Sequence, residues 1–93
     1  MFFVYILFSE KLNRYYIGTT DDVERRLIEH NTFVYANSFT SKGVPWQLRF
    51  SYNCSSSHQA YSLELFIKKM KSRKFIERLI EDKNIVLDIV NRL

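Results

Sequence analysis

The sequence predicts one α+β domain, in which a small three-stranded antiparallel sheet is flanked by helices. Three observations predict this class. The chain has 93 residues, a length that fits a single domain spanning 1–93. Residues 2–8 form a continuous apolar run of strand length, and two further strand-like segments occur at 14–18 and 47–53. Apolar residues after position 20 repeat at helical spacing in several segments between and beyond these strands.

Residues 2–8 (FFVYILF) are expected to form the central strand, because an uninterrupted apolar run is typical of a strand covered on both faces. A polar turn at 9–13 leads into a second strand at 14–18 (RYYIG), so the two segments predict an antiparallel hairpin. Gly18 ends this strand, at a point where the backbone needs either conformational freedom or a close approach to a neighbour.

The first helix is expected to begin at Asp21 or Asp22 and to run to about Asn31. Asp21 and Glu24 have the spacing of a capping box, and both carboxylates suit the positive end of a helix. Residues 31–46 show little periodicity, so they predict a loop longer than most in a compact domain, a kind of segment that is often functional.

The third strand, at 47–53 (QLRFSYN), alternates polar and apolar side chains. Its inward side chains are predicted to be Leu48, Phe50 and Tyr52. Serines at 55–57 cap a second helix, with Ser56 paired to Gln59, and this helix runs to about residue 71. Two more helices are expected, at about 72–82 and 85–93.

Positive charge is concentrated in the second half of the chain. The formal net charge is +4, and six of the fourteen Lys and Arg residues lie between Lys68 and Arg78. Only Glu77 opposes them in that segment. Such a cluster suggests a polyanionic partner, most often nucleic acid, although a solvated helix face is an equally good interpretation of charge alone.

Several classes of protein are excluded. No apolar run approaches the roughly 18 residues of a membrane span, and residues 1–5 do not resemble a signal peptide. Cys54 is a lone thiol, which points to a reducing, cytoplasmic setting and to packing rather than catalysis. The chain has no Walker loop, dinucleotide glycine signature or nucleophile elbow, so no small-molecule cofactor is expected. His58 is expected to face solvent.

Two polar residues lie at the edge of the predicted first helix's buried stripe, which Val23 and Leu27 define. Arg26 and His30 are four residues apart, so they share one side of the helix and lean toward the sheet. A guanidinium beside a core needs a charged partner or a ligand, unless it reaches water along its alkyl stem.

Glu64 lies on the shoulder of the second helix's buried stripe. That stripe consists of Ala60, Leu63, Ile67 and Met70. Glu64 can form an ordinary i,i+4 pair with Lys68, worth only about 0.3–0.5 kcal/mol. Alternatively, a lone half-buried carboxylate beside cations suits Mg²⁺, which takes one or two carboxylates and completes its shell with water and phosphate.

Tyr5 and Tyr16 lie in the two strands of the predicted hairpin. Strand tyrosines usually pack in the core, but Tyr16 is followed at once by Ile17, Gly18 and a helix start, which places its hydroxyl near the helix opening.

Read in order, these residues resemble the GIY-YIG nuclease superfamily, in the small stand-alone bacterial form. The similar segments cover nearly the whole chain: Val4-Tyr5-Ile6, Tyr16-Ile17-Gly18, residues 19–31 with Arg26 and His30, residues 40–46, and Ala60, Glu64, Ile67, Lys68, Lys69, Lys71 and Lys74. Phe3 and Val4 replace the glycine and isoleucine of the first motif, and Lys42 is the one cation of the loop.

The resemblance implies cleavage of phosphodiesters with one divalent metal. Glu64 would bind Mg²⁺ or Mn²⁺, and Tyr5 or Tyr16 would help to deprotonate the attacking water. Arg26 would neutralise charge on the phosphate, and His30 would assist by proton transfer or hydrogen bonding. The nucleic acid would be held by the basic residues Lys42, Lys68, Lys69, Lys71, Arg73 and Lys74.

The leading hypothesis is therefore a monomeric, metal-dependent endonuclease acting on DNA, in particular on branched, flapped or damaged DNA. It requires Tyr5, Tyr16, Arg26, His30 and Glu64 to surround one shared pocket. The alternative is a non-catalytic module on the same scaffold that binds nucleic acid or a protein partner. A third interpretation is purely structural, with Arg26 and Glu64 as a stabilising ion pair.

Overall fold

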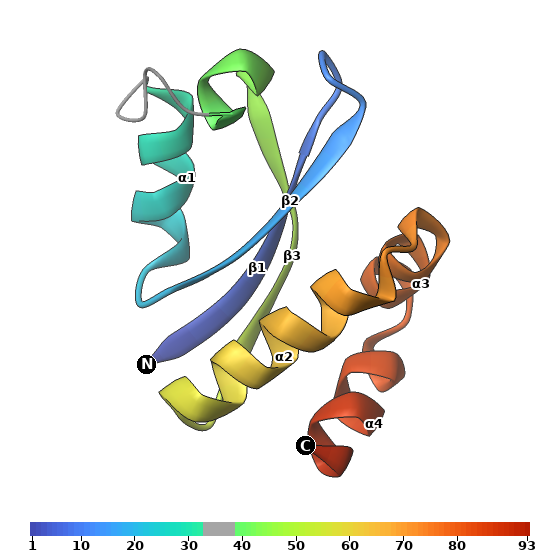
Figure 1. The fold of residues 1–93 in the computed structure, drawn as a ribbon. Coiled ribbons are helices and arrows are strands. Elements are labelled where there is room, and N and C mark those ends of the chain that lie inside the picture. The colour runs from blue at the N-terminus through green and yellow to red at the C-terminus, as the bar shows by residue number, and fades with distance from the viewer. Residues whose placement is uncertain (33–38) are drawn as a thin grey trace.

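The computed structural model describes residues 1–32 and 39–93; the part of the predicted loop at 33–38 lies outside the described residues. The elements follow one another in the predicted order (Figure 1). They are β1 (Phe2–Ser9), β2 (Arg14–Thr20), α1 (Val23–Asn31), a short 3₁₀ helix η1 (Phe39–Gly43), β3 (Trp46–Cys54), α2 (Ser57–Met70), α3 (Arg73–Glu81) and α4 (Lys83–Arg92). The α+β class predicted from the sequence is confirmed.

The sheet has the order β2-β1-β3, and both pairs of neighbouring strands are antiparallel. β1 is the central strand, as its uninterrupted apolar run predicts. Its register with β2 places Tyr5 opposite Gly18 and Leu7 opposite Tyr16. These pairings bring the two tyrosine-bearing segments together at the middle of the sheet.

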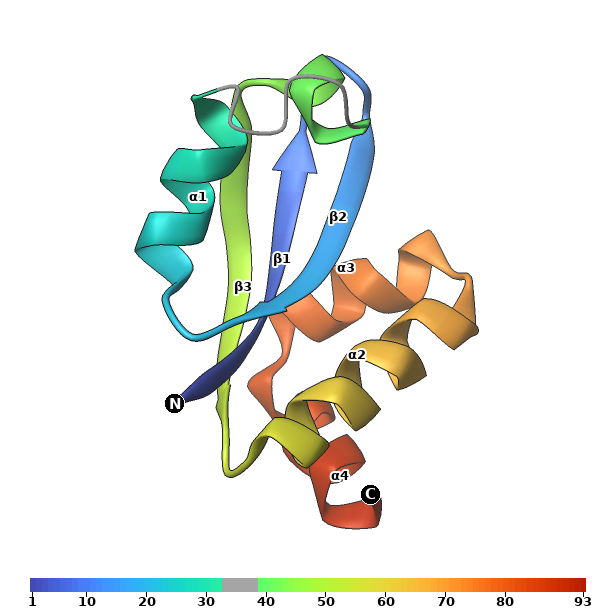
Figure 2. The same cartoon turned by 60° about the vertical axis from the view of Figure 1, so that its left-hand side comes forward.

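Each face of the sheet is covered by its own set of helices (Figure 2). α1 covers one face, where Tyr5, Leu7 and Trp46 form a small core with Val23 and Leu27. The other face carries the larger core, which α2, α3 and α4 close. The buried members of that core are Val4, Ile6, Cys54, Ala60, Leu63, Ile67, Leu79, Val86 and Ile89. Side chains of β1 alternate between the two cores because successive strand residues point to opposite faces.

The predicted inward position of Leu48 is wrong, because 40% of this residue is exposed. Strict alternation would place Leu48 on the same face as Phe50, which does pack against the larger core. The pairing of β1 with β3 instead shifts between Ile6 and Leu7, so that Ile6 pairs with Phe50 but Leu7 with Leu48. This bulge leaves Arg49 unpaired and moves Leu48 to the α1 face. The same strand begins at Trp46, which was expected in the loop.

Most helix ends follow the predicted capping. Ser56 accepts a hydrogen bond from the backbone N–H of Gln59, as expected. Asp22, rather than Asp21, caps α1 by accepting from the Arg25 N–H, while Asp21 pairs with the Arg25 guanidinium. Met70 was expected in the buried stripe of α2, but it is 45% exposed, because it occupies the last helical position and the helix meets the core no further than Ile67.

Candidate active site

Tyr5, Tyr16 and His30 form one cluster on the α1 face of the sheet. The Tyr5 hydroxyl lies 3.0 Å from Nε2 of His30, and the two residues are only 2% and 3% exposed. The Tyr16 ring meets the imidazole edge-on, with 4.9 Å between ring centroids, and lies 6.3 Å from the Tyr5 ring. The helical spacing that pointed His30 toward the sheet therefore corresponds to a direct contact with the first tyrosine.

Gly18 makes room for this cluster. A Cβ atom built on Gly18 would lie 2.7 Å from the Tyr5 hydroxyl oxygen and 2.9 Å from Tyr5 Cζ, both closer than real Cβ contacts allow. Its φ angle is not positive, so the residue is needed for close approach rather than for conformational freedom. The ring of Tyr5 lies over the strand that carries Tyr16, and only glycine leaves that space open.

The last turn of α1 is tied to the start of β3 by Asn31. Its side-chain amide donates to the Trp46 carbonyl at 3.0 Å, and its Oδ1 accepts from the Trp46 backbone N–H at 2.6 Å. The Trp46 ring meets Tyr16 edge-on at 6.1 Å, and its Nε1 donates to the Thr40 carbonyl. Sequence reasoning missed Asn31 and Trp46; the available signal was an asparagine at the end of the helix that carries His30.

Arg26 lies one turn before His30 on α1, with its side chain about one-third exposed. Its Nε is 3.4 Å from Oε1 of Glu29. Burial of the imidazole lowers the pKa of His30, and the nearby Arg26 charge lowers it further. His30 is consequently held in its neutral form at pH 7. Nε2 accepts from the Tyr5 hydroxyl when the imidazole proton is on Nδ1, and donates to the hydroxyl oxygen when the proton is on Nε2.

The structure does not join Glu64 to this cluster by a direct contact. Glu64 is on α2, which covers the opposite face of the sheet. Within the described ranges, its interaction is with Lys68, whose Nζ lies 2.7 Å from Oε2, so the ordinary i,i+4 pair is present. The Glu64 side chain is 20% exposed. β2 is an edge strand and α2 packs against it, so the outer edge of β2 is one place where a substrate could reach both Glu64 and the α1-face cluster.

The single carboxylate of Glu64 suits a hard cation that the protein binds weakly. Among residues 1–32 and 39–93 there is no group of three or more His, Cys, Asp or Glu side chains that could enclose a metal ion. A metal at Glu64 would thus be held by one carboxylate, with water and substrate phosphate as its other ligands, which is a common arrangement for Mg²⁺. Lys68 would have to release the carboxylate for the metal to bind.

The predicted nucleic-acid-binding residues fall into two groups. Five are exposed lysines: Lys42 on η1, and Lys68, Lys69, Lys71 and Lys74 around the end of α2 and the start of α3. Arg73 differs because its guanidinium is already engaged, donating to the backbone carbonyl and to Oδ1 of Asn13 at 2.9 and 2.8 Å. It also pairs with Glu77 and lies over the Phe8 and Tyr15 rings.

The two residues expected to be inert are where the sequence placed them. Cys54 is buried in the larger core, and burial raises the pKa of its thiol. His58 is exposed in the first turn of α2.

Comparison with known proteins places the chain in a family. The family model of the GIY-YIG catalytic domain matches residues 1–77, and the chain belongs to the GIY-YIG family. This family consists in general of endonucleases, which act on nucleic acid and typically use divalent metals.

Two small proteins are similar over most of their lengths. The UPF0213 protein VPA1222 of Vibrio parahaemolyticus is 36% identical over 84 residues, which is 89% of this chain and 76% of that protein. The solution NMR structure of the UPF0213 protein BH0048 of Bacillus halodurans is 29% identical, with a TM-score of 0.55. That similarity covers 87% of this chain and 84% of the other. In the described part of the chain, no helix has the length and apolar character needed to cross a membrane.

The close approach at Gly18 predicts the effect of adding one methyl group. Gly18→Ala should lower the free energy of unfolding by about 1–3 kcal/mol, because the buried Tyr5 ring has to shift. In a strand position with free space, the same change typically stabilises by about 0.5–1 kcal/mol. Urea unfolding of the parent and the variant shows whether the free energy of unfolding falls or rises. Tyr5→Phe removes the nearest atom, so the loss should be smaller in that background; a Gly18→Ala protein as stable as the parent contradicts the packing described.

The lowered pKa of His30 predicts a pH-dependent stability. The unfolded histidine takes up a proton near its ordinary pKa of 6.5, whereas the folded one does so only at lower pH. His30 therefore contributes stability above that pH, and the contribution is lost as the pH falls toward the folded pKa. Urea unfolding at about pH 7 and about pH 5 measures the loss. His30→Gln should flatten the dependence, whereas His58→Gln should leave it unchanged; equal effects of both variants contradict the assignment.

Proposed function

We propose that this protein is a divalent-metal-dependent endonuclease that hydrolyses phosphodiester bonds in DNA, with branched, flapped or damaged DNA as the favoured substrate. The observation that carries the proposal is the buried Tyr5–His30 hydrogen bond, with Tyr16 packed on the imidazole and Arg26 one helical turn away. The Tyr5 phenol and the His30 imidazole are in contact, and the Arg26 guanidinium belongs to the same helix as His30. Together these groups have the chemistry needed to move a proton beside a phosphate.

Tyr16 is the better placed of the two tyrosines to meet the substrate. Tyr5 is 2% exposed and its hydroxyl is engaged by His30, whereas Tyr16 is only partly buried. In the proposed arrangement, Tyr16 orients the attacking water, and the Tyr5–His30 pair provides neutral, proton-accepting groups behind it. The sequence left open which tyrosine acts on the water, and this proposal assigns that role to Tyr16.

Arg26 would stabilise the negative charge that develops on the phosphate. Its guanidinium lies at the edge of the α1 core and keeps about one-third of its side chain exposed, so an oxyanion can reach it. A fixed cation beside a developing charge is among the strongest contributions to phosphoryl transfer. The same charge keeps His30 neutral, because it helps to lower the pKa of the imidazole.

Glu64 would hold Mg²⁺ or Mn²⁺. When bound, such an ion lowers the pKa of water and stabilises negative charge on the phosphodiester. Because Glu64 and the tyrosine cluster belong to opposite faces of the sheet, the scissile phosphate would lie at the outer edge of β2, between the two. The exposed lysines around the end of α2 lie on the same side as Glu64 and would attract the flanking phosphates.

Cleavage of a branched, 5′-labelled DNA in Mg²⁺ or Mn²⁺ tests the proposal. Glu64→Gln should reduce the rate by about 100-fold or more, because the one anchoring carboxylate is lost. Asp88→Asn is the matched control, since Asp88 also forms an i,i+4 pair, with Arg92 at 3.0 Å, in an exposed part of α4. Asp88→Asn should change stability only slightly, as expected for an exposed helix pair. Glu64→Gln keeps the size of a side chain that is 20% exposed, so urea unfolding of both variants accompanies the assay.

Equal cleavage by the Glu64→Gln and Asp88→Asn proteins would contradict the role of Glu64. Salt-sensitive DNA binding without cleavage in either metal would favour the second candidate, a non-catalytic nucleic-acid-binding module. The observation behind that candidate is the Glu64–Lys68 ion pair, which engages the only carboxylate assigned to the metal.

A further inference from the structure

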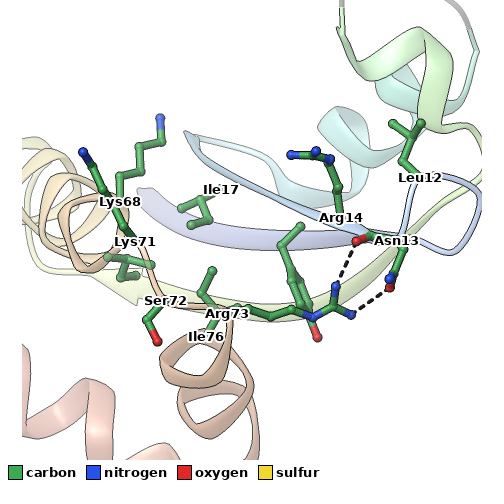
Figure 3. Close-up of a pocket in the computed structure, with 11 residues that line it drawn as sticks. Leu12, Asn13, Arg14, Ile17, Lys68, Lys71, Ser72, Arg73 and Ile76 are labelled. Atoms are coloured by element: carbon green, nitrogen blue, oxygen red, sulfur yellow. Dashed lines mark hydrogen bonds between the residues drawn. The ribbon is translucent and has the colours of Figure 1, made fainter.

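A pocket of about 600 Å³ lies between the β1–β2 turn and the junction of α2 with α3. Figure 3 shows Lys68 and Lys71 at one end of it, Arg14 and Asn13 at the other, and Ile17 between them. It is a feature of the α2 side of the sheet, so it is separate from the Tyr5–His30 cluster. Its volume is within the range of pockets that bind small ligands.

The pocket is lined by four cations and by no carboxylate: Arg14, Lys68, Lys71 and Arg73. Two of them are compensated, since Lys68 pairs with Glu64 and Arg73 with Glu77. Within residues 1–32 and 39–93, Arg14 and Lys71 have no ion pair. Both side chains are exposed, so they are available to attract an anionic ligand to the pocket. The pocket also includes Ser72 and thus the N-terminus of α3, whose positive dipole end adds to the attraction.

The walls of the pocket are apolar. Ile17 comes from β2, Ile67 from α2 and Ile76 from α3, and Tyr15 adds an aromatic ring. Arg73 holds these elements in place, because its bonds to Asn13 join the start of α3 to the β1–β2 turn across 60 residues of sequence. A ligand with both an anionic group and an apolar part, such as a nucleotide, therefore matches this lining better than a free phosphate does.

We infer that this pocket takes one unpaired nucleotide, with its phosphate beside Lys71 and the N-terminus of α3, its base against Ile17 and Ile76, and Arg14 contacting the far side of the base. A base inside a duplex is stacked and cannot enter, so the inference selects nucleic acids with an extruded or single-stranded nucleotide. This inference rests on the proposed function, because the nucleotide would belong to the nucleic acid that the proposed nuclease cleaves. Lys68 connects the two sites, since it lines the pocket and also contacts Glu64.

The test is a ¹H–¹⁵N NMR titration of the full chain with deoxyadenosine 5′-monophosphate in metal-free buffer. The amides of Ile17, Lys71 and Ile76 should shift together. Arg14→Gln and Lys71→Gly should each weaken binding by about tenfold, the usual cost of losing one charge-assisted bond. Lys71 has a φ of 47°, so glycine removes its charge without straining the turn. Lys83→Gln is the control, because this exposed cation at the start of α4 does not line the pocket, and binding should be unchanged.

Three results would overturn the inference: no shifts around the pocket, equal affinity for inorganic phosphate, or equal affinity for a glutamate-rich peptide. The titration contains no metal and no cleavable bond, so its failure leaves the proposed nuclease activity untouched. Conversely, equal cleavage by the Glu64→Gln and Asp88→Asn proteins would contradict the proposed role of Glu64 and would leave mononucleotide binding as a separate result. Deoxyadenosine without its phosphate should bind more weakly than the monophosphate, and equal binding also counts against the pocket.

Discussion

The hydrogen bond between the Tyr5 hydroxyl and His30 is the contact on which the rest of the candidate site depends. It joins the central strand to the covering helix at a place where both residues are almost fully buried. Two constraints make it possible: Gly18 leaves space for the Tyr5 ring, and Asn31 ties the end of α1 to Trp46. Tyr16 packs on the imidazole that these constraints hold in place. A buried polar pair of this kind is costly to disturb, because either partner left alone would lose its hydrogen bond without gaining water.

Much of the fold could be predicted because its strongest signals are local. The apolar run of β1 identifies the central strand, and Ser56 and Gln59 mark the start of α2. Leu48 was misplaced because the bulge in β3 arises from pairing with β1 and leaves no mark on the alternation of the strand itself. Met70 was misplaced because helical periodicity does not reveal where the sheet beneath a helix ends.

The site was predictable to a smaller extent. Helical spacing placed Arg26 and His30 on the sheet side of α1, and the family resemblance supplied the tyrosines and Glu64. Neither source indicated that Glu64 belongs to the opposite face, or that Arg73 would be used to hold the β1–β2 turn rather than left free. The pocket beside Lys71 could not be predicted at all, because its two ends are far apart in sequence and meet only through tertiary packing.

The outer edge of β2 lies between the two groups of predicted site residues. The proton-handling groups lie on one face, and the predicted metal ligand and most of the assigned cations lie on the other. β2 is an edge strand that carries Tyr16 and packs against α2, the helix of Glu64. A nucleic acid strand that follows this edge would meet both sets in turn.

Paramagnetic broadening by Mn²⁺ tests most directly whether the two faces serve one site. At low Mn²⁺ concentrations, the amide signals of Glu64 in α2 and of Tyr16 and Gly18 in β2 should broaden first and together, and Glu64→Gln should remove the effect from both elements. Broadening that is centred elsewhere in the chain, or that spares β2 while affecting α2, would contradict the account.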